Sequence, residues 1–589
     1  MAQVVTASLK LEKDFPQTPS VARFGRWAMP FGPAVFFLNL ATSILFLLFG
    51  PYSNFAAAGY LDPWFYTGYF THFTYMVSHF GATYYASRLP WIIPGVLVFK
   101  IAPPMAASVL LNALICAFSG TALFFIVYWS YGPFPAVLAS IVLVTNPYFM
   151  STISWDYPDG PAIAYAFAAL ALFAHPPPVR FKYSMGAGIA FALCAATNLA
   201  AIPVLLGILV VPVWRYKRDP KAFVHTAVGA LSGAILTSAI LIILSKWLLN
   251  LYQFYLPQVR MIEYVRAHPD YLANMWGTGN AWIPKAYRLG PALFTVFAGG
   301  AVLFRRSART GIYLPVYLCW ITTFGLLCLF EFGFHNVSLR VAYVGSYMVC
   351  PLMACAGLLI GEAMFQRDAR SKPSAAGYVI AAALAAFGIA LPVLYAQSRV
   401  PPISFSEFWI GLAVLSLVTP VLLAVPRRSR IFGTAACGLI FIALFLGPAR
   451  DQALGYVWTN ENADVFQTLM RIEGVIDSSV PRTRTVRFWY DLHEPASNLF
   501  DSAYSLYLWA YFDFTKQLPS AREGDIKRLV DSNTTFAHLT LNTDKTAERT
   551  RLLAERGIIV GNQRSAVMHS QLGDIHLVLQ DVVDDSKLH

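Results

Sequence analysis

The chain has 589 residues, of which 57% are hydrophobic and only 13% are charged, and its mean hydropathy is +0.54. Soluble domains carry about 25% charged residues, so a soluble globule is excluded and most of the chain must face lipid. The net charge of +12 comes without a nucleic-acid-binding motif and is therefore interpreted from where the charges lie. All seven cysteines lie within apolar runs, which indicates neither a disulfide framework nor a cysteine zinc site.

Apolar runs that are suited to crossing a bilayer recur along most of the chain. A span needs about 20 apolar residues and must pair its backbone polar groups internally, so helices are the expected form. The fold class is therefore predicted as mainly α, a polytopic transmembrane helical bundle with about thirteen spans. They are expected near Ala34–Gly50, Met105–Tyr128, Phe134–Met150, Pro161–Ala174, Tyr183–Thr197, Leu199–Val213, Val224–Leu249, Pro291–Phe304, Ile312–Phe330, Val341–Ile360, Tyr378–Ala396, Phe408–Val425 and Ile431–Leu446.

The distribution of basic residues predicts the orientation of the chain. With the N-terminus inside, the inner segments hold more than twice as many Lys and Arg residues as the outer loops, as the positive-inside rule requires. An odd number of crossings then places everything after about Gly447 outside, in the periplasm of a Gram-negative bacterium. The start, Met1–Ala28, lacks the apolar region of a signal peptide, so the first span is expected to be a retained anchor. The predicted location is the inner membrane, with a cytoplasmic N-terminus.

The tail, residues 450–589, differs in kind from the membrane module predicted for residues 1–449. It is charged, contains no span, and alternates strand-like and helix-like runs. Strands are predicted at Thr485–Asp491, Phe536–Leu541 and Ile575–Gln580, and a helix at Ala547–Gly557. This pattern predicts a small extracytoplasmic α/β domain. We interpret this domain as a cap or scaffold, and substrate recognition is the alternative role.

Ionisable residues are scarce inside the predicted spans, where Lys246 is nearly the only one. A charge at mid-bilayer is costly and is usually kept for function, although a lysine near a helix end can reach the interface. The polar chemistry gathers instead in the outer loops. This distribution favours a site at the outer membrane surface over a pore.

The first outer loop, Pro51–Pro104, is long, and long loops in compact proteins are usually functional. Asp62 is its only acidic residue. The aromatic residues that follow, Tyr66 among them, are dense enough to suggest a helix lying in the headgroup layer. Arg88 and Lys100 are the only basic residues of the loop, and either of them is suited to headgroup anchoring or to an anionic ligand.

Two further outer loops contain candidate residues. The second holds Asp156 and Asp159, and Asp159 is also interpretable as a helix N-cap signal because Gly-Pro follows it. The third, Asn250–Leu289, holds Arg260 and Arg266 among aromatic residues. That mixture suits sugar rings and membrane interfaces equally well.

The chain resembles the GT-C superfamily of membrane glycosyltransferases. The resemblance rests on Asp62, on Ser87–Gly95 (SRLPWIIPG), on Trp155–Pro161 (WDYPDGP) and, more loosely, on Leu339–Leu359. Within the superfamily the chain is most similar to the protein O-mannosyltransferases and the lipid A aminoarabinose transferases. It departs from them at Pro63, because related transferases often have two adjacent acidic residues in the first loop.

The resemblance implies transfer of a sugar from a polyprenyl-phosphate donor to an acceptor hydroxyl on the outer face, the acceptor being a glycan, a lipid or a protein. Such chemistry needs a carboxylate base and cations that stabilise the phosphate leaving group. Asp62 is the expected base. The implied phosphate-binding residues are Arg88, Lys100, Arg260 and Arg266, and the implied sugar or acceptor contacts are Asp156, Asp159, Tyr66, Arg340 and Tyr343.

No cofactor and no metal are predicted. His72 and His79 lie seven residues apart on the same predicted helix, a spacing that would suit a metal site together with nearby carboxylates, but loop histidines are more often interfacial. A transporter or flippase of lipid-linked glycans is the alternative function, and a non-catalytic assembly partner is a third. A flippase needs a polar path through the bilayer centre.

Overall fold

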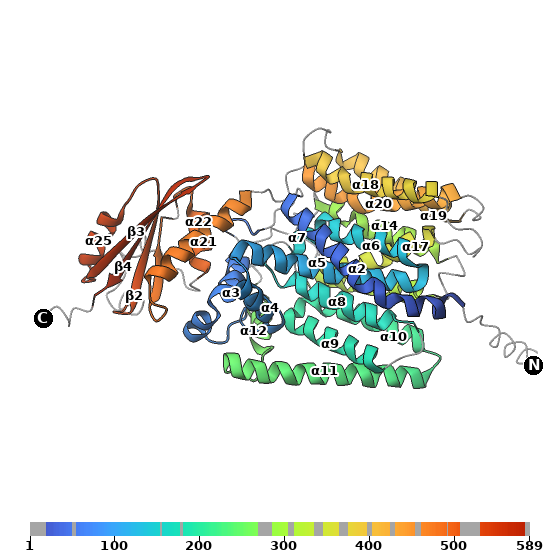
Figure 1. Ribbon diagram of the computed structural model, residues 1–589, viewed down its shortest axis with the longest axis horizontal. Helices are drawn as coiled ribbons and strands as arrows, with labels where there is room; N and C mark the ends of the chain where they lie inside the picture. The colour runs from blue at the N-terminus through green and yellow to red at the C-terminus, as the bar shows by residue number, and fades with distance from the viewer. Residues whose placement is uncertain are drawn as a thin grey trace, which may run out of the picture.

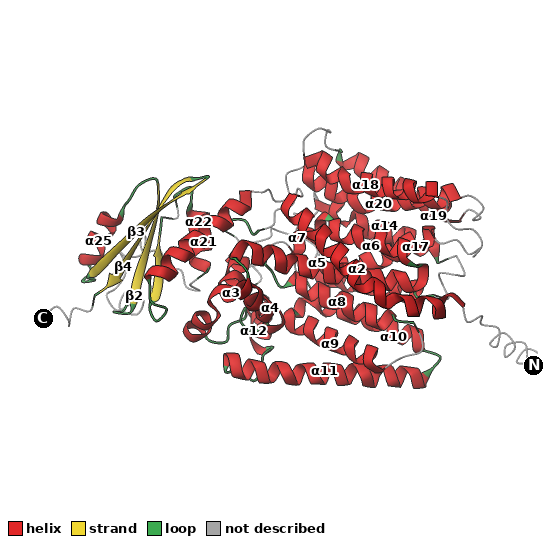
Figure 2. Cartoon of the chain, in the orientation of Figure 1, coloured by secondary structure: helices red, strands yellow, loops and turns green. Residues whose placement is uncertain are grey.

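The computed structural model describes most of the chain. The described residues are 19–49, 55–59, 61–153, 156–176, 181–268, 285–303, 311–334, 346–364, 375–396, 403–424, 430–453, 461–491, 493–506 and 530–583. Two parts are visible, a large body of helices and a smaller domain with a sheet (Figure 2). The small domain lies at one end of the helical body, and the N-terminal end of helix α2 (Pro19–Phe49) lies at the opposite end (Figure 1).

The helical body is built from apolar helices that pack side by side. After α2 they are α5 (Pro104–Tyr131), α6 (Pro133–Thr145), α7 (Pro147–Ile153), α8 (Asp159–Ala174), α9 (Phe181–Thr197), η1 (Leu199–Ala201), α10 (Ile202–Tyr216), α11 (Pro220–Leu249), α14 (Gly290–Val302), α16 (Tyr313–Cys328), η3 (Leu329–Gly333), η4 (Ser346–Met348), α17 (Val349–Met364), α18 (Ala375–Ala396), α19 (Phe405–Ala424) and α20 (Arg430–Ala453).

Each of the thirteen predicted spans coincides with a helix, but the count of about thirteen crossings is not confirmed. Within the described residues, eight helices are long and apolar enough to cross a membrane, or nine if α6 and α7, bent by 57°, form one broken span. Helices such as α8, α9 and α14 have 16, 17 and 13 residues. Helices of that size are about 20 to 26 Å long, less than the roughly 30 Å of a hydrocarbon core.

Glycines allow two of the long helices to approach closely. A Cβ at Gly188 of α9 would lie 1.8 Å from the carbonyl oxygen of Ala230 in α11. A Cβ at Gly233 of α11 would lie 2.0 Å from the carbonyl oxygen of Met185 in α9. Membrane helices lack a hydrophobic force between them and associate through such close backbone packing. The α9–α11 pair therefore depends on the absence of side chains at these two positions.

Three helices lie at the end of the helical body that faces the small domain, and none of them is a candidate span. They are α3 (Leu61–Phe80), α4 (Leu89–Ile101) and α12 (Leu256–Ala267). Helix α3 lies beside the small domain, and α4 lies behind it toward the membrane helices (Figure 1). The long first outer loop predicted from the sequence is therefore a helical segment placed between the two parts of the molecule.

The small domain is an α/β unit, as predicted. Its four strands are β1 (Thr485–Trp489), β2 (Thr534–Leu541), β3 (Val560–Ser570) and β4 (Gly573–Val582), in the order β1-β2-β4-β3. β1 and β2 are parallel, whereas β4 is antiparallel to both β2 and β3. The helices are α21 (Glu461–Ser479), α22 (Ser497–Ser505) and α25 (Thr546–Ala554). Because α20 continues to Ala453, the predicted division between residues 449 and 450 falls inside its last turn.

We expect Gly188→Ala to destabilise the protein, because the added methyl group must displace the backbone of Ala230. Overpacking of this kind costs about 1–3 kcal/mol. The check is the thermal unfolding midpoint of the purified protein in detergent. Gly325→Ala in α16 is the matched control, since a Cβ there meets no atom within 4 Å. Equal midpoints for the two variants would contradict the proposed packing.

Candidate active site

Arg88 occupies the turn that begins α4, and its side chain is buried. Pro90 favours the start of the helix at this point, and Arg88 is the residue that precedes the first helical turn. Only 1% of Arg88 is exposed. Its guanidinium donates hydrogen bonds to the hydroxyls of Tyr66 and Tyr84. It also lies 4.1 Å from the ring centre of Tyr84 and 5.6 Å from that of Tyr66.

Arg88 forms no direct salt bridge with a carboxylate among the described residues: its hydrogen bonds go to phenols, and Asp159 acts on it only through the longer-range attraction between their charges. The buried Nε of Arg88 has no hydrogen-bond partner among those residues. Phenol hydroxyls and ring faces attract a cation but do not neutralise it. A buried ion without a counter-charge is costly, so it is expected where an anionic ligand completes the site. Arg88 therefore has the environment of an anion-binding residue.

Asp62 lies in the first turn of α3 and accepts hydrogen bonds from two tyrosines. Tyr85 donates to its Oδ1, and Tyr157 donates to its Oδ2 over 3.3 Å. Burial first, and the Asp62 charge second, raise the pKa of Tyr85 well above its usual value, so this phenol stays protonated and remains a donor. The Asp62 side chain itself is only partly buried.

Tyr66 connects Asp62 with Arg88. Its ring lies 5.1 Å from that of Tyr85 and 5.8 Å from that of Tyr157, both at steep angles. Burial raises the pKa of the Tyr66 hydroxyl, and the charges of Arg88, Asp62 and Asp159 all act on it. The structure therefore brings these predicted site residues together around one tyrosine. Tyr66 is fully buried, and its hydroxyl accepts a hydrogen bond from Arg88, so it contacts the cation from within the protein.

Asp156 faces α5 and holds the loop between α7 and α8. Its carboxylate accepts from Ser108 at 3.0 and 2.9 Å, from Asn112 at 3.3 Å and from Thr67 at 3.5 Å. Its φ of 53° is in the left-handed region, which is rare for a residue other than glycine. The next residue, Tyr157, reaches Asp62. Asp156 therefore fixes the loop from which Tyr157 extends.

Asp159 begins α8 but does not cap it. The structure assigns the N-cap position to Pro158 and shows no side-chain cap, so the N-cap interpretation is wrong. The Asp159 carboxylate accepts instead from the hydroxyl of Tyr347 in η4 and from Asn198 Nδ2 at 2.8 Å. These bonds join the start of α8 to two distant segments of the chain. Asp159 therefore belongs to the same cluster.

Several other predicted residues lie elsewhere. Lys100 is exposed near the far end of α4, about 17 Å along the helix axis from its start. Arg260 and Arg266 are exposed on α12, which has only one buried side chain. Arg340 and Tyr343 lie outside the described residues. The described geometry therefore makes Arg88 the cation of the Asp62 cluster.

The tyrosines Tyr84, Tyr85 and Tyr157 belong to this site and were not predicted as site residues. Each carries a hydroxyl that bonds to Asp62 or Arg88. Tyr84 and Tyr85 belong to the dense aromatic run of the first outer loop, which is predicted to lie in the headgroup layer, and Tyr157 belongs to the Trp155–Pro161 motif. The hydroxyl partners depend on the fold and are not visible from spacing.

Among the described residues, no group of three His, Cys, Asp or Glu side chains lies close enough to hold a metal. His72 instead pairs with Glu473, Nε2 to Oε1 at 2.6 Å, and its Nδ1 lies 3.8 Å from Asp477. His79 contacts the Tyr75 carbonyl and Ser78. The absence of a bound metal stays a prediction.

Comparisons with known proteins give similarities only at the level of solved structures. No protein-family model and no curated protein match the chain. The structure of ArnT from Cupriavidus metallidurans bound to undecaprenyl phosphate is 13% identical to this chain, with a TM-score of 0.44; the match covers 95% of this chain and 98% of that chain. The apo structure of the same protein is 14% identical, with the same coverage of both chains and a TM-score of 0.39. The apo oligosaccharyltransferase of Archaeoglobus fulgidus is 12% identical, covers 89% and 71%, and has a TM-score of 0.41. At these values the activity must be argued from this chain's own residues.

We expect Asp156 to make stability depend on pH. Burial raises the pKa of Asp156 to about 6, against the opposing hydrogen bonds. The folded protein therefore holds this proton more tightly than the unfolded chain, so stability is greatest below about pH 4 and is lost as the pH rises through about 6. The expected loss is about 2–3 kcal/mol. Melting midpoints of wild type and Asp156→Asn between pH 4.5 and 7.5 provide the check, because the variant should lack this decline.

Proposed function

We propose that the chain transfers a hexose or pentose from a polyprenyl-phosphate donor to an acceptor hydroxyl at the outer membrane surface. The observation that carries the proposal is the buried Arg88, whose Nε has no hydrogen-bond partner and which has no direct salt bridge among the described residues, beside the Asp62 carboxylate held by two phenols. The planar fork of a guanidinium matches the geometry of phosphate oxygens, which it can grip with two parallel hydrogen bonds. The donor's lipid chain explains why such a site lies among apolar helices.

The proposed reaction needs two groups from the protein. The bond between the sugar C1 and the phosphate oxygen breaks while a bond forms between C1 and the acceptor oxygen. Asp62 takes the acceptor's proton, and Arg88 stabilises the negative charge that grows on the departing polyprenyl phosphate. The phenols of Tyr85 and Tyr157 orient the Asp62 carboxylate. Because Asp62 is partly exposed whereas Arg88 is buried, the acceptor would enter on the Asp62 side.

The orientation proposed for the chain places this site outside the cytoplasm. Lys217, Arg218 and Lys221 surround the turn between α10 and α11, which lies at the end of the helical body away from the small domain (Figure 1). Basic turns of this kind mark the cytoplasmic side. The small domain, α3 and the Asp62 cluster then lie on the opposite, extracytoplasmic side, which would be the periplasm if the membrane is a bacterial inner membrane.

The positions of the acidic and basic residues of the candidate spans favour an enzyme over a flippase. Lys246 lies in the last turn of α11 and donates to the side chain of Asn250. Glu362 lies near the end of α17 and accepts from Tyr131 at 2.8 Å. Glu331 lies at the end of the span Tyr313–Gly333. Charges near span ends do not form the polar path through the bilayer centre that a flippase needs.

We expect Arg88→Ala to weaken binding of polyprenyl phosphate by about 10- to 100-fold, the usual loss for a hydrogen bond between charged groups. Binding of undecaprenyl phosphate to the detergent-purified protein, followed by intrinsic fluorescence, is the measurement. Lys246→Ala is the matched control, because it removes a partly exposed cation from the same side of the membrane. Unchanged affinity in Arg88→Ala would remove the phosphate assignment.

We expect Asp62→Asn to lower kcat by at least about 100-fold, the contribution of a positioned general base. Donor affinity should be retained, because Arg88 keeps its phenol partners. Single-turnover transfer from a radiolabelled polyprenyl-phosphate sugar measures the chemical step separately from donor binding. Full transfer by Asp62→Asn would sink the catalytic assignment, and loss of lipid export without loss of transfer would favour the flippase.

A further inference from the structure

Helices α21 and α22 of the small domain contact the segment just before Asp62. Asn462 of α21 donates from Nδ2 to the carbonyl oxygen of Phe55 at 2.8 Å. Ser502 of α22 accepts from the backbone amide of Gly59 at 2.9 Å, and both partners of this bond come from segments far apart in sequence. Gly59 has a φ of 84°, which L-residues rarely adopt. The chain is therefore fixed to the small domain three residues before Asp62.

The same two helices contact α3 again after Asp62. A Cβ at Gly68 would lie 2.7 Å from the carbonyl oxygen of Leu506, so the backbone of α3 lies directly against the end of α22. Farther along, α3 kinks at His72, whose φ of −121° and ψ of 32° are not helical. The buried His72 ring forms its ion pair with Glu473 of α21 at this kink.

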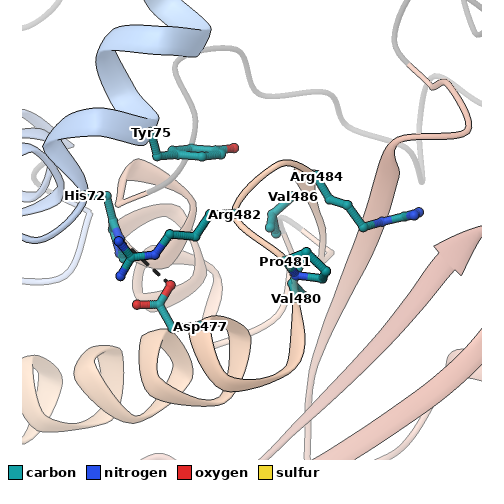
Figure 3. A pocket seen from close by; sticks show the side chains of 8 residues that line it. All are labelled: His72, Tyr75, Asp477, Val480, Pro481, Arg482, Arg484 and Val486. Carbon is teal, nitrogen blue, oxygen red and sulfur yellow. Dashed lines mark ion pairs between the residues drawn. The ribbon is translucent and has the colours of Figure 1, made fainter.

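The His72 side chain connects the kink of α3 to α21. A small pocket beside the ring is lined by His72, Tyr75, Asp477, Val480, Pro481, Arg482, Arg484 and Val486. Figure 3 shows His72 pointing toward Asp477 across this space, with Arg482 beside them. The contacts of His72 with Glu473 and Asp477 therefore join the kink to α21.

Aromatic packing fills the space between these contacts. The Phe466 ring of α21 lies 4.5 Å from that of Phe55 and 5.8 Å from that of Trp64. The Tyr504 ring of α22 lies 6.4 Å from that of Phe65 at 90°. Trp64 and Phe65 immediately follow the Asp62-Pro63 step. The start of α3 is therefore packed against the small domain through Trp64 and Phe65.

We propose that α21 and α22 form a clamp that positions Asp62, with Ser502, Glu473 and the Leu506 backbone as its positioning groups. The partners that orient Asp62 lie outside both α3 and the small domain: Tyr85 lies between α3 and α4, and Tyr157 lies just before α8 in the helical body. Asp62 therefore keeps its alignment only while the small domain holds α3 against that body. The inference rests on the proposed function for its catalytic consequence, and it assigns the small domain a role inside the active site.

Gly68→Ala tests the clamp, because the new methyl group forces α3 away from Leu506. Amide hydrogen exchange of α3 should increase, and kcat for sugar transfer should fall by about 10- to 100-fold, the usual cost of misplacing a catalytic group by about 1 Å. The KM for the donor should change by less than about threefold, since Arg88 keeps its contacts with Tyr84. Gly474→Ala in α21 is the matched control, because a Cβ there meets no atom within 4 Å.

Ser502→Ala serves as the second variant, in case Gly68→Ala does not fold. It removes the bond from the Gly59 amide, together with the bond that Ser502 donates to the Asn498 carbonyl within α22, and it should show the same exchange and kcat changes to a smaller extent. Exchange equal to that of Gly474→Ala would overturn the clamp. Increased exchange with unchanged kcat would overturn the positioning of Asp62. If Asp62→Asn transfers sugar as well as wild type, the proposed function fails, and the exchange comparison still decides whether the clamp exists.

Discussion

The cost of burying the Arg88 guanidinium without a carboxylate in direct contact is the constraint on which the site depends. Full desolvation of an ion costs several kcal/mol even after the protein relaxes. Phenol oxygens and ring faces return part of this energy and leave the positive charge uncancelled. A carboxylate at hydrogen-bond distance would have given a more stable protein and occupied the place of an anionic ligand. The surrounding tyrosines are therefore a compromise between folding and binding.

The same tyrosines separate the base from the cation. If Asp62 contacted Arg88 directly, the two charges would form an ion pair, which would lower the basicity of Asp62 and occupy Arg88. The ring of Tyr85, bonded to Asp62, lies instead against the ring of Tyr66, bonded to Arg88. Both charges are thereby held in one cluster and remain available to different parts of a substrate. This separation explains why a membrane-facing loop contains so many hydroxylated aromatic rings.

The sequence predicted what depends on composition and local period. Hydropathy located a helix at each expected span, and alternation located the strands around Thr485 and Ile575. Asp62 and Arg88 were paired because the resemblance implies a carboxylate base and a phosphate-binding cation, and the structure places both in one cluster. The roles of Tyr85 and Tyr157, the kink at His72 and the exposed positions of Arg260 and Arg266 depend on contacts between distant segments. Such contacts leave no periodic signal in a single sequence.

Asp156 and Asp159 show why spacing alone could not assign the acidic residues. The two carboxylates are three residues apart, yet one bonds to α5 and the other to η4 and Asn198. The left-handed backbone at Asp156 turns the chain between them, so Tyr157 extends toward Asp62. A strained residue of this kind persists only where surrounding bonds over-determine it. The three hydroxyl and amide donors around Asp156 hold its backbone in this conformation. The loop therefore keeps Tyr157 directed toward the Asp62 base.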